Sequence, residues 1–173
     1  QFGRYYALII GNQDYQQLTD LETPRTDSEL AAKLLKDKYG FSVQVVADAD
    51  DIAMLKALND LNQRVKPEDN VLNYAGHGTR LPAGRSEVGY WMPVNAELPP
   101  RDTFWLPNEQ VTAHLARLPA RRVLVVADSC YAGLLSTDPS VNMFGIEENV
   151  TLDYVRYKLP KRSRLLLASG GDE

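Results

Sequence analysis

The chain has 173 residues, 44% apolar and 24% charged, which is long and apolar enough to bury the core of one domain. Its net charge of −4 argues against a nucleic-acid binder, and its longest apolar stretches are strand-sized, which argues against a membrane-spanning helix. A single cysteine excludes an intrachain disulfide, and no signal peptide is visible, so the compartment stays open.

The N-terminal part begins with a strand pattern followed by a helix pattern. Residues 5–10 are apolar and predict a strand that ends at Gly11. Residues 26–29 (TDSE) have the spacing of a capping box and predict the start of a helix. Three leucines then form a helical stripe before Gly40 ends the helix: Leu30, Leu34 and Leu35.

The same alternation continues through the middle of the chain. Residues 41–47 predict a second strand, and residues 70–75 predict a third. Between them a helix is expected from Asp51 to Pro67, with an apolar stripe made of Ile52, Leu55, Leu58 and Leu61. Strands that alternate with helices predict an α/β fold whose parallel sheet is connected by right-handed crossovers.

The second half is less regular. Residues 79–107 are expected to be irregular, since they contain five prolines. A helix follows over residues 108–118 and a strand over 122–128. We expect a loop at 136–145, and the remaining elements are a helix near 147–157 and a strand at 164–168. No internal repeat or low-complexity tract is present.

Cys130 is the candidate nucleophile. It lies in the segment ADSCYAG (127–133), at the end of the most apolar run in the chain, and His77 lies 53 residues upstream in YAGHG (74–78). A reactive thiol needs a neighbour that takes or stabilises its proton, and a histidine supplies this. If the two strands that precede these residues are parallel neighbours, both groups emerge at the same carboxyl edge of the sheet.

Two other interpretations of these residues are less favoured. Cys130 could be a buried structural cysteine and His77 a turn residue, but the paired setting at two strand ends favours catalysis. A zinc site is not indicated, because one cysteine and two histidines are too few ligands, and His114 falls on an amphipathic helix where a surface or packing role is expected.

With these motifs assembled, the chain resembles the caspase-like cysteine peptidases of the metacaspase and bacterial orthocaspase branch. Four motifs in family order carry the resemblance: ALIIGN (7–12), TPRTDS (23–28), YAGHG (74–78) and DSCYAG (128–133). The resemblance implies a caspase-hemoglobinase fold, a three-layer αβα sandwich, and a dyad of Cys130 and His77 that cleaves peptide bonds. It also implies that the backbone amides of Gly78 and Cys130 form the oxyanion hole.

The resemblance further implies a first specificity pocket lined by Asp27 and Asp128. Two carboxylates would attract an Arg or Lys side chain of a substrate and repel an acidic one. Asp27 can equally serve as an acidic residue at a helix start, and the two roles are compatible. Arg25 lies close to the pocket segment in sequence and could change the sign of its charge.

We expect no cofactor and no metal. Calcium-dependent relatives carry an acidic cluster after the His loop, whereas residues 80–87 here contain one carboxylate and two arginines, a poor cage for a cation that takes six to eight oxygen ligands. The other acidic run, residues 48–51 (DADD), lacks the glycine and glutamate of an EF-hand loop and is better interpreted as a helix start.

The predicted function is therefore a cysteine endopeptidase, one domain over residues 1–173, acting as a monomer on proteins or peptides with Arg or Lys before the scissile bond. The abrupt ends predict a fragment of a longer chain that lacks the last strand of the family sheet. Self-cleavage is expected near the basic residues between Lys158 and Arg162. The alternative is a catalytically latent caspase-like domain that acts as a signalling or binding module.

Overall fold

The computed structural model describes residues 3–18, 20, 24–75, 78–83, 86–128, 142–143 and 163–169. Within these residues the strands of the central sheet are β1 (Tyr5–Gly11), β2 (Ser42–Ala47), β3 (Asn70–Ala75), β7 (Arg122–Asp128), β8 (Asn142–Met143) and β9 (Ser163–Ser169). They lie in the order β2-β1-β3-β7-β9-β8, and every neighbouring pair is parallel. The predicted parallel sheet is confirmed.

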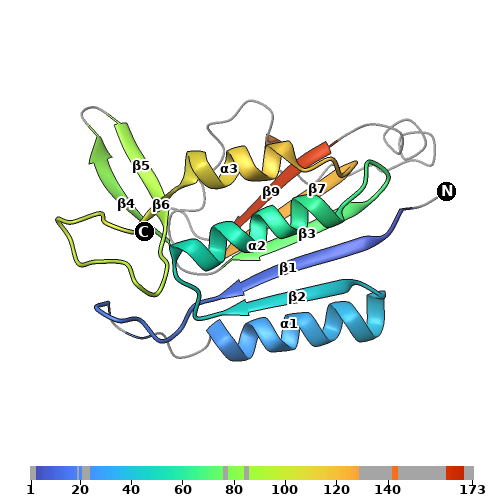
Figure 1. Ribbon diagram of the computed structural model, residues 1–173, viewed down its shortest axis with the longest axis horizontal. Helices are drawn as coiled ribbons and strands as arrows, with labels where there is room; N and C mark the ends of the chain where they lie inside the picture. The colour runs from blue at the N-terminus through green and yellow to red at the C-terminus, as the bar shows by residue number, and fades with distance from the viewer. Residues whose placement is uncertain are drawn as a thin grey trace.

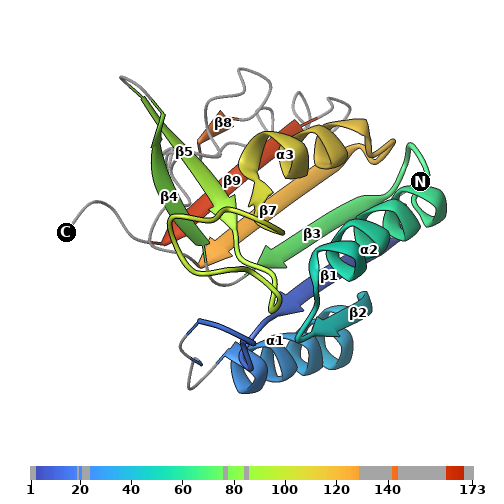
Figure 2. The ribbon, with the colours of Figure 1, turned by 60° about the vertical axis from the view of Figure 1, so that its left-hand side comes forward.

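Within the described ranges, three helices connect β1, β2, β3 and β7: α1 (Pro24–Tyr39), α2 (Asp51–Arg64) and α3 (Asn108–Arg117). From β1 the chain moves outward to β2 through α1, and it then returns in the opposite direction through α2 to β3 and through α3 to β7. Because parallel crossovers are right-handed, α1 lies on one face of the sheet and α2 and α3 lie on the other (Figures 1 and 2). This is the three-layer α/β/α arrangement predicted from the sequence.

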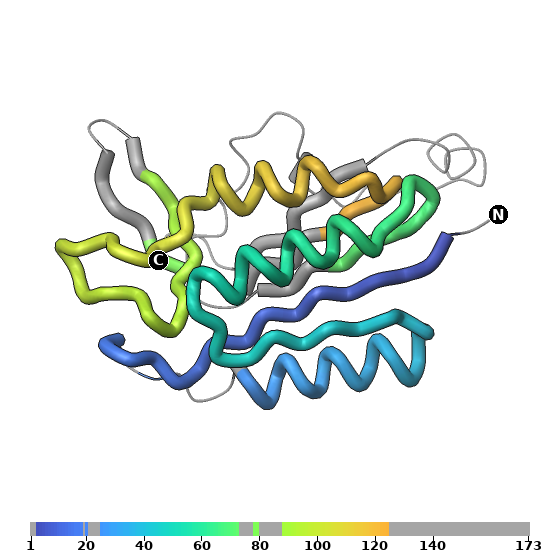
Figure 3. Tube along the Cα trace, in the orientation of Figure 1, coloured from blue at the N-terminus to red at the C-terminus, as the bar shows by residue number. Residues whose placement is uncertain are grey.

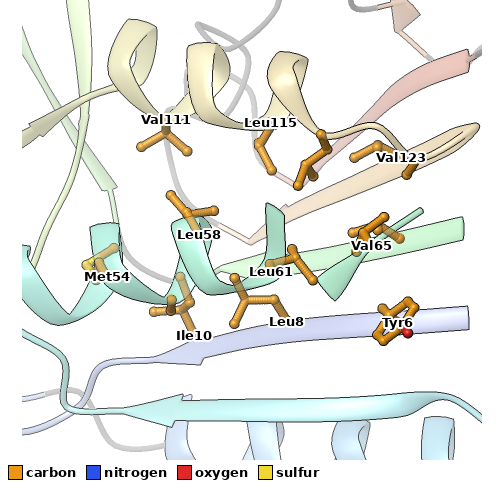
Figure 4. Packing of buried hydrophobic residues seen from close by; sticks show 14 of the residues in the cluster. Tyr6, Leu8, Ile10, Met54, Leu58, Leu61, Val65, Val111, Leu115 and Val123 are labelled. Carbon is orange, nitrogen blue, oxygen red and sulfur yellow. The ribbon is translucent and has the colours of Figure 1, made fainter. Parts of the chain in front are cut away.

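Among the described residues, the larger cluster of buried apolar side chains lies between the sheet and the layer formed by α2 and α3 (Figure 4). Strand β1 contributes alternate side chains to it, because successive residues of a strand point to opposite faces. The buried residues of α2 and α3 pack against these β1 side chains. The cluster includes Tyr6, Leu8, Ile10, Met54, Ala57, Leu58, Leu61, Val65, Val111, Leu115 and Val123.

The start and the apolar stripe of α1 differ from the sequence prediction. The helix begins at Pro24, which suits the first helical position since proline has no amide hydrogen to satisfy there, so Thr26 is not the cap of a capping box. Leu30 and Leu34 are 61% and 51% exposed, and among the residues 25–39, whose burial is described, Ser28 alone is fully buried. The stripe predicts the helix correctly, but most of it does not face the core.

Residues 79–107, expected to be irregular, contain a second sheet of three antiparallel strands, so that prediction was wrong. These strands are β4 (Gly78–Ala83), β5 (Ser86–Trp91) and β6 (Leu106–Pro107), in the order β4-β5-β6. Pro82 and Pro107 both lie in edge strands, the part of a sheet in which proline is tolerated because one side of the strand has no ladder bonds to lose. Proline content therefore did not exclude strands here.

The remaining expectations concern element ends and the C-terminal region. Helix α2 ends at Arg64 rather than Pro67, and α3 and β7 match their predicted ranges to within one residue. The expected helix at 147–157 and most of the loop at 136–145 lie outside the described residues. Within the parts of the chain that the structure describes, each helix is too short or too polar to cross a bilayer.

Candidate active site

The ends of β3 and β7 lie side by side in the centre of the sheet. The two strands are parallel and pair in a register that sets Ala75 opposite Ala127. In sequence, His77 comes two residues after the end of β3, and Cys130 comes two residues after the end of β7. Both residues lie outside the described ones. The parallel adjacency on which the dyad prediction depends is confirmed, and the dyad itself stays a prediction.

This edge is also where the sheet topology favours a ligand site. The chain leaves β1 in one direction to β2 and later passes to β3 on the other side, so the connections diverge between β1 and β3. In open α/β sheets, ligands bind outside the carboxyl ends of the strands at such a switch point. His77 follows β3 directly at this position.

Gly78 marks the transition from the large sheet to the small one. It is the first residue of β4, it is buried, and it pairs with Trp91 of β5. Only two residues, at positions 76 and 77, separate it from the end of β3. The small sheet therefore begins at the same carboxyl edge, next to the ends of β3 and β7 (Figure 2).

A buried asparagine connects three segments at this edge. The Asn12 side chain, 4% exposed, accepts a hydrogen bond from the amide of Ala49 (2.8 Å). Its Nδ2 donates to the carbonyl oxygens of Ala49 (3.2 Å) and Met92 (3.1 Å). Asn12 thereby ties the end of β1 to the β2–α2 loop and to the segment after β5. Sequence reasoning had given Asn12 only the role of a motif residue.

A second, smaller cluster packs beyond the edge, around Tyr15, Met92, Ala96 and Trp105. Segment 12–18 and segment 92–105 lie together here (Figure 3), joined by a hydrogen bond from the Gln16 amide to the Val94 carbonyl (2.9 Å). The Tyr15 hydroxyl donates to the Met92 carbonyl (3.3 Å). Burial, with the nearby negative charge of Asp48, raises the pKa of Tyr15, so this phenol stays protonated. The sequence had not indicated this cluster.

Asp27 and Asp128, the two predicted pocket residues, come from elements that meet this edge. Asp27 lies in the first turn of α1 and is exposed, and α1 begins where the β1 and β2 arrows end in Figure 1. Asp128 is the last residue of β7. The helix-start interpretation of Asp27 is confirmed by its position, since a carboxylate there is favoured by the helix dipole. The pocket role of both residues stays a prediction.

Arg25, whose effect on the charge of the first pocket the sequence left open, is paired with two carboxylates. Its Nη2 contacts Asp14 Oδ2 at 3.0 Å and also Asp48 Oδ2. These contacts, led by the hydrogen bond with Asp48, raise the pKa of Arg25 and keep it charged. Burial opposes ionisation of Asp48, but amide hydrogen bonds from Asp14 and Gln13, together with Arg25, outweigh it and lower the pKa of Asp48.

The other polar predictions can be compared with the structure directly. Asp50 caps α2 by accepting a hydrogen bond from the Ala53 amide (2.7 Å), and Asp51 lies in its first turn, so the acidic run is a helix start as predicted. His114 lies on α3 with Nδ1 2.9 Å from the Gln110 carbonyl oxygen, in keeping with a surface role. Among the described residues, no group of three or more His, Cys, Asp or Glu could hold a metal ion.

The fold and the strand-end motifs define an α/β protein of the caspase type. A family model described as the caspase domain of peptidase C14 matches residues 4–172, and the chain therefore belongs to this family of cysteine peptidases. It is 29% identical over 144 residues to Metacaspase-4 of Arabidopsis thaliana. That match covers 73% of this chain and 33% of the plant protein, so the chain aligns with about a third of its relative's length.

Proposed function

We propose that this domain is a cysteine endopeptidase that cleaves peptide bonds after Arg or Lys, with Cys130 as nucleophile and His77 as its acid–base partner. The observation that carries the proposal is the register of β3 and β7, which sets Ala75 opposite Ala127 at the carboxyl edge. Each candidate residue follows one of these neighbouring strand ends. Membership of the caspase family supports the same reaction.

In the proposed reaction, the Cys130 thiolate attacks the substrate carbonyl carbon and forms a C–S bond. The electron pair of the C=O bond moves to oxygen, where the amides of Gly78 and Cys130 stabilise the negative charge. When the C–N bond breaks, the protonated His77 donates its proton to the leaving amine. Water, deprotonated by His77, then hydrolyses the thioester, which releases the acid and restores the thiol.

Selection of a basic side chain is assigned to Asp27 and Asp128. An arginine substrate would gain charge-assisted hydrogen bonds of about 1.5–3 kcal/mol each, while an acidic substrate would place like charges together. The planar guanidinium can bond two carboxylates at once, so arginine should match or exceed lysine. Asp27 is exposed in the first turn of α1, which supports its availability for a substrate.

A panel of fluorogenic peptides that differ only in the residue before the scissile bond tests the proposal. We expect Arg and Lys peptides to be cleaved several powers of ten faster than Asp peptides, and Cys130→Ala to abolish cleavage. Asp128→Ala should lose most activity on Arg peptides without gaining any on Asp peptides. Equal cleavage after Arg, Asp and Leu would contradict the pocket assignment, and the absence of both turnover and labelling by an arginyl ketone would favour the latent module.

Two regulatory features belong to the same proposal. Activity is expected without calcium, since residues 80–87 contain a single carboxylate and Asp50 is engaged as a helix cap. A chelator should therefore change the rate little, and a loss restored by calcium would contradict this. Self-cleavage between Lys158 and Arg162 should appear as a mass change on storage that Cys130→Ala prevents.

A further inference from the structure

We propose that Asp48 is a positioning residue for substrate selection, because its pairing with Arg25 holds that positive charge away from the first pocket. The inference rests on the proposed preference for basic substrates. It assigns a role to a residue outside the four family motifs, on the loop between β2 and α2. We call the trio of Arg25, Asp14 and Asp48 the Arg25 clamp.

The Asp48 carboxylate is held firmly at the end of β1. Its Oδ1 accepts hydrogen bonds from the amides of Gln13 (2.9 Å) and Asp14 (3.0 Å), and its own amide donates to the Gly11 carbonyl (3.2 Å). Asp48 has a φ of 48°, in the left-handed region, where aspartate is one of the few residues other than glycine that occur often. One oxygen is thus fixed by the backbone, which leaves Oδ2 directed at Arg25.

Arg25 is the second residue of α1, and three contacts fix its position. The Arg25 Nη2 atom binds the carboxylates of Asp14 and Asp48, and the backbone amide of Arg25 donates to Oε1 of Gln13 (3.4 Å). The side chain is 42% exposed, so little packing would hold it in place if these partners were removed. The clamp carries one negative charge in total, and therefore adds no positive charge to the edge.

The position of Arg25 matters because Asp27 lies only two residues further along the helix. Residues two apart on an α-helix project about 200° from each other, so the clamped Arg25 and Asp27 point in different directions. Both residues nevertheless lie in the first turn, where Cα atoms two residues apart are about 5 Å from each other, so a guanidinium that left the clamp could come within the Debye length of about 8 Å from the Asp27 carboxylate. Without the Asp48 charge, Arg25 would keep only the exposed Asp14 as a partner. A guanidinium that left this weaker pair would oppose a cationic substrate side chain and compete with it for Asp27.

The test compares two peptides that differ only in arginine or citrulline before the scissile bond, since citrulline has nearly the shape of arginine without its charge. We expect Asp48→Asn to lower the Arg-to-citrulline ratio of kcat/KM about tenfold, mainly through KM of the Arg peptide. Asparagine keeps an oxygen that accepts from the amides of Gln13 and Asp14, so citrulline cleavage should be unchanged. The decrease should shrink as salt is added.

Two further variants separate charge from structure. Adding Arg25→Gln to Asp48→Asn should restore the ratio, because the released cation is gone. Asp37→Asn is the matched control, since it frees Lys33 (2.6 Å from Asp37) on the same helix but away from the edge, and it should leave the ratio unchanged.

The outcomes distinguish this inference from the proposed function. A wild-type ratio near one would contradict both the basic preference and the role of the clamp. A wild-type preference that survives in Asp48→Asn, or an equal loss on both peptides, would contradict the clamp alone. If Asp48→Asn does not fold, Arg25→Gln decides: an unchanged or raised ratio supports the clamp, and a lowered ratio overturns it.

Discussion

The two helices nearest the N-terminus, α1 and α2, have similar patterns in the sequence but different surroundings in the fold. In α2, Met54, Leu58 and Leu61 are buried under α3 and against β1, whereas Leu30 and Leu34 of α1 are largely exposed. The difference arises because α2 crosses the centre of the sheet beside α3, while α1 lies over β1 and the edge strand β2 (Figure 1). An amphipathic stripe predicts a helix, and the neighbouring layer decides how much of it is covered.

The two sides of the sheet are expected to differ in their roles, with the α2 and α3 layer important for stability and the start of α1 important for function. Among the described residues, α2 and α3 pack into the larger of the two buried apolar clusters, and burial of this kind dominates the free energy of folding. Helix α1 contributes less burial but carries Arg25 and Asp27 at the carboxyl edge, where β3 and β7 end. We therefore expect substitutions in the α2 layer to affect unfolding, and substitutions at the carboxyl edge to affect catalysis.

The largest expected effect is on catalysis. Cys130→Ala or His77→Ala should lower kcat/KM on Arg peptides more than about a thousandfold, because each removes a reacting group. The midpoint of thermal unfolding should change little, since both residues follow strand ends at the sheet edge. Peptide cleavage and calorimetry on the same preparations measure the two effects. Activity that survives in either variant would contradict the dyad.

The next effect compares matched leucines of the two helices. Leu61→Ala removes a side chain with no exposed surface and should lower the free energy of unfolding by about 2–5 kcal/mol. Leu34→Ala, at a largely exposed position of α1, should change it by less than about 0.5 kcal/mol. Urea denaturation of both variants measures the difference. Similar losses would show that α1 is covered in solution.

A smaller effect on stability is expected for Asn12, whose hydrogen bonds connect the end of β1 to the β2–α2 loop and to the segment after β5. Asn12→Ala leaves the buried amide of Ala49 without its acceptor and should cost about 1–3 kcal/mol. The carbonyl of Met92 keeps the Tyr15 hydroxyl as a donor, and that of Ala49 keeps the Val94 amide, which limits the loss. If denaturant unfolding showed no change, the described hydrogen bonds of Asn12 would not matter for stability.

The smallest effect is the pH dependence of the clamp. Because the pKa of Asp48 is lower in the folded state than in the unfolded chain, its contribution to stability is complete above about pH 4 and is lost as the pH falls through the folded value. Arg25 is half exposed, so the contribution is modest. Urea midpoints between pH 7 and pH 2.5 should converge for wild type and Asp48→Asn as the pH falls. Parallel curves would contradict this assignment.

The sequence predicted the elements of the large sheet better than the segments outside it. Strand β3 and strand β7 were predicted with their observed bounds, because continuous apolar runs between turn residues are typical of buried parallel strands. Strands β4 and β5 were missed, because the prolines and polar residues of this segment resemble a loop. Their backbone groups are satisfied by pairing of β5 with β4 and with β6, and this pairing depends on contacts between segments that the local sequence pattern does not show.

The candidate site also has a part that the sequence indicates and a part that only the structure shows. His77 and Cys130 are candidates from the sequence alone, since two strand ends with small residues and a histidine–cysteine pair indicate nucleophilic chemistry by residue type. The Arg25 clamp could not be predicted: its members come from the β1–α1 loop, from α1 and from the β2–α2 loop, up to 34 residues apart. Their charges were visible in the sequence, but their pairing was not.

By itself, therefore, the sequence determined most of the strands and helices of the large sheet, and it named candidates for nucleophile and base, because periodicity and side-chain chemistry are local properties. Tertiary structure decided the order of the strands, the exposure of α1, the formation of the second sheet and the pairing of Arg25 with Asp14 and Asp48. Each of these depends on contacts between segments distant in the chain. Which of the competing contacts forms is set by burial and hydrogen bonding over the whole fold.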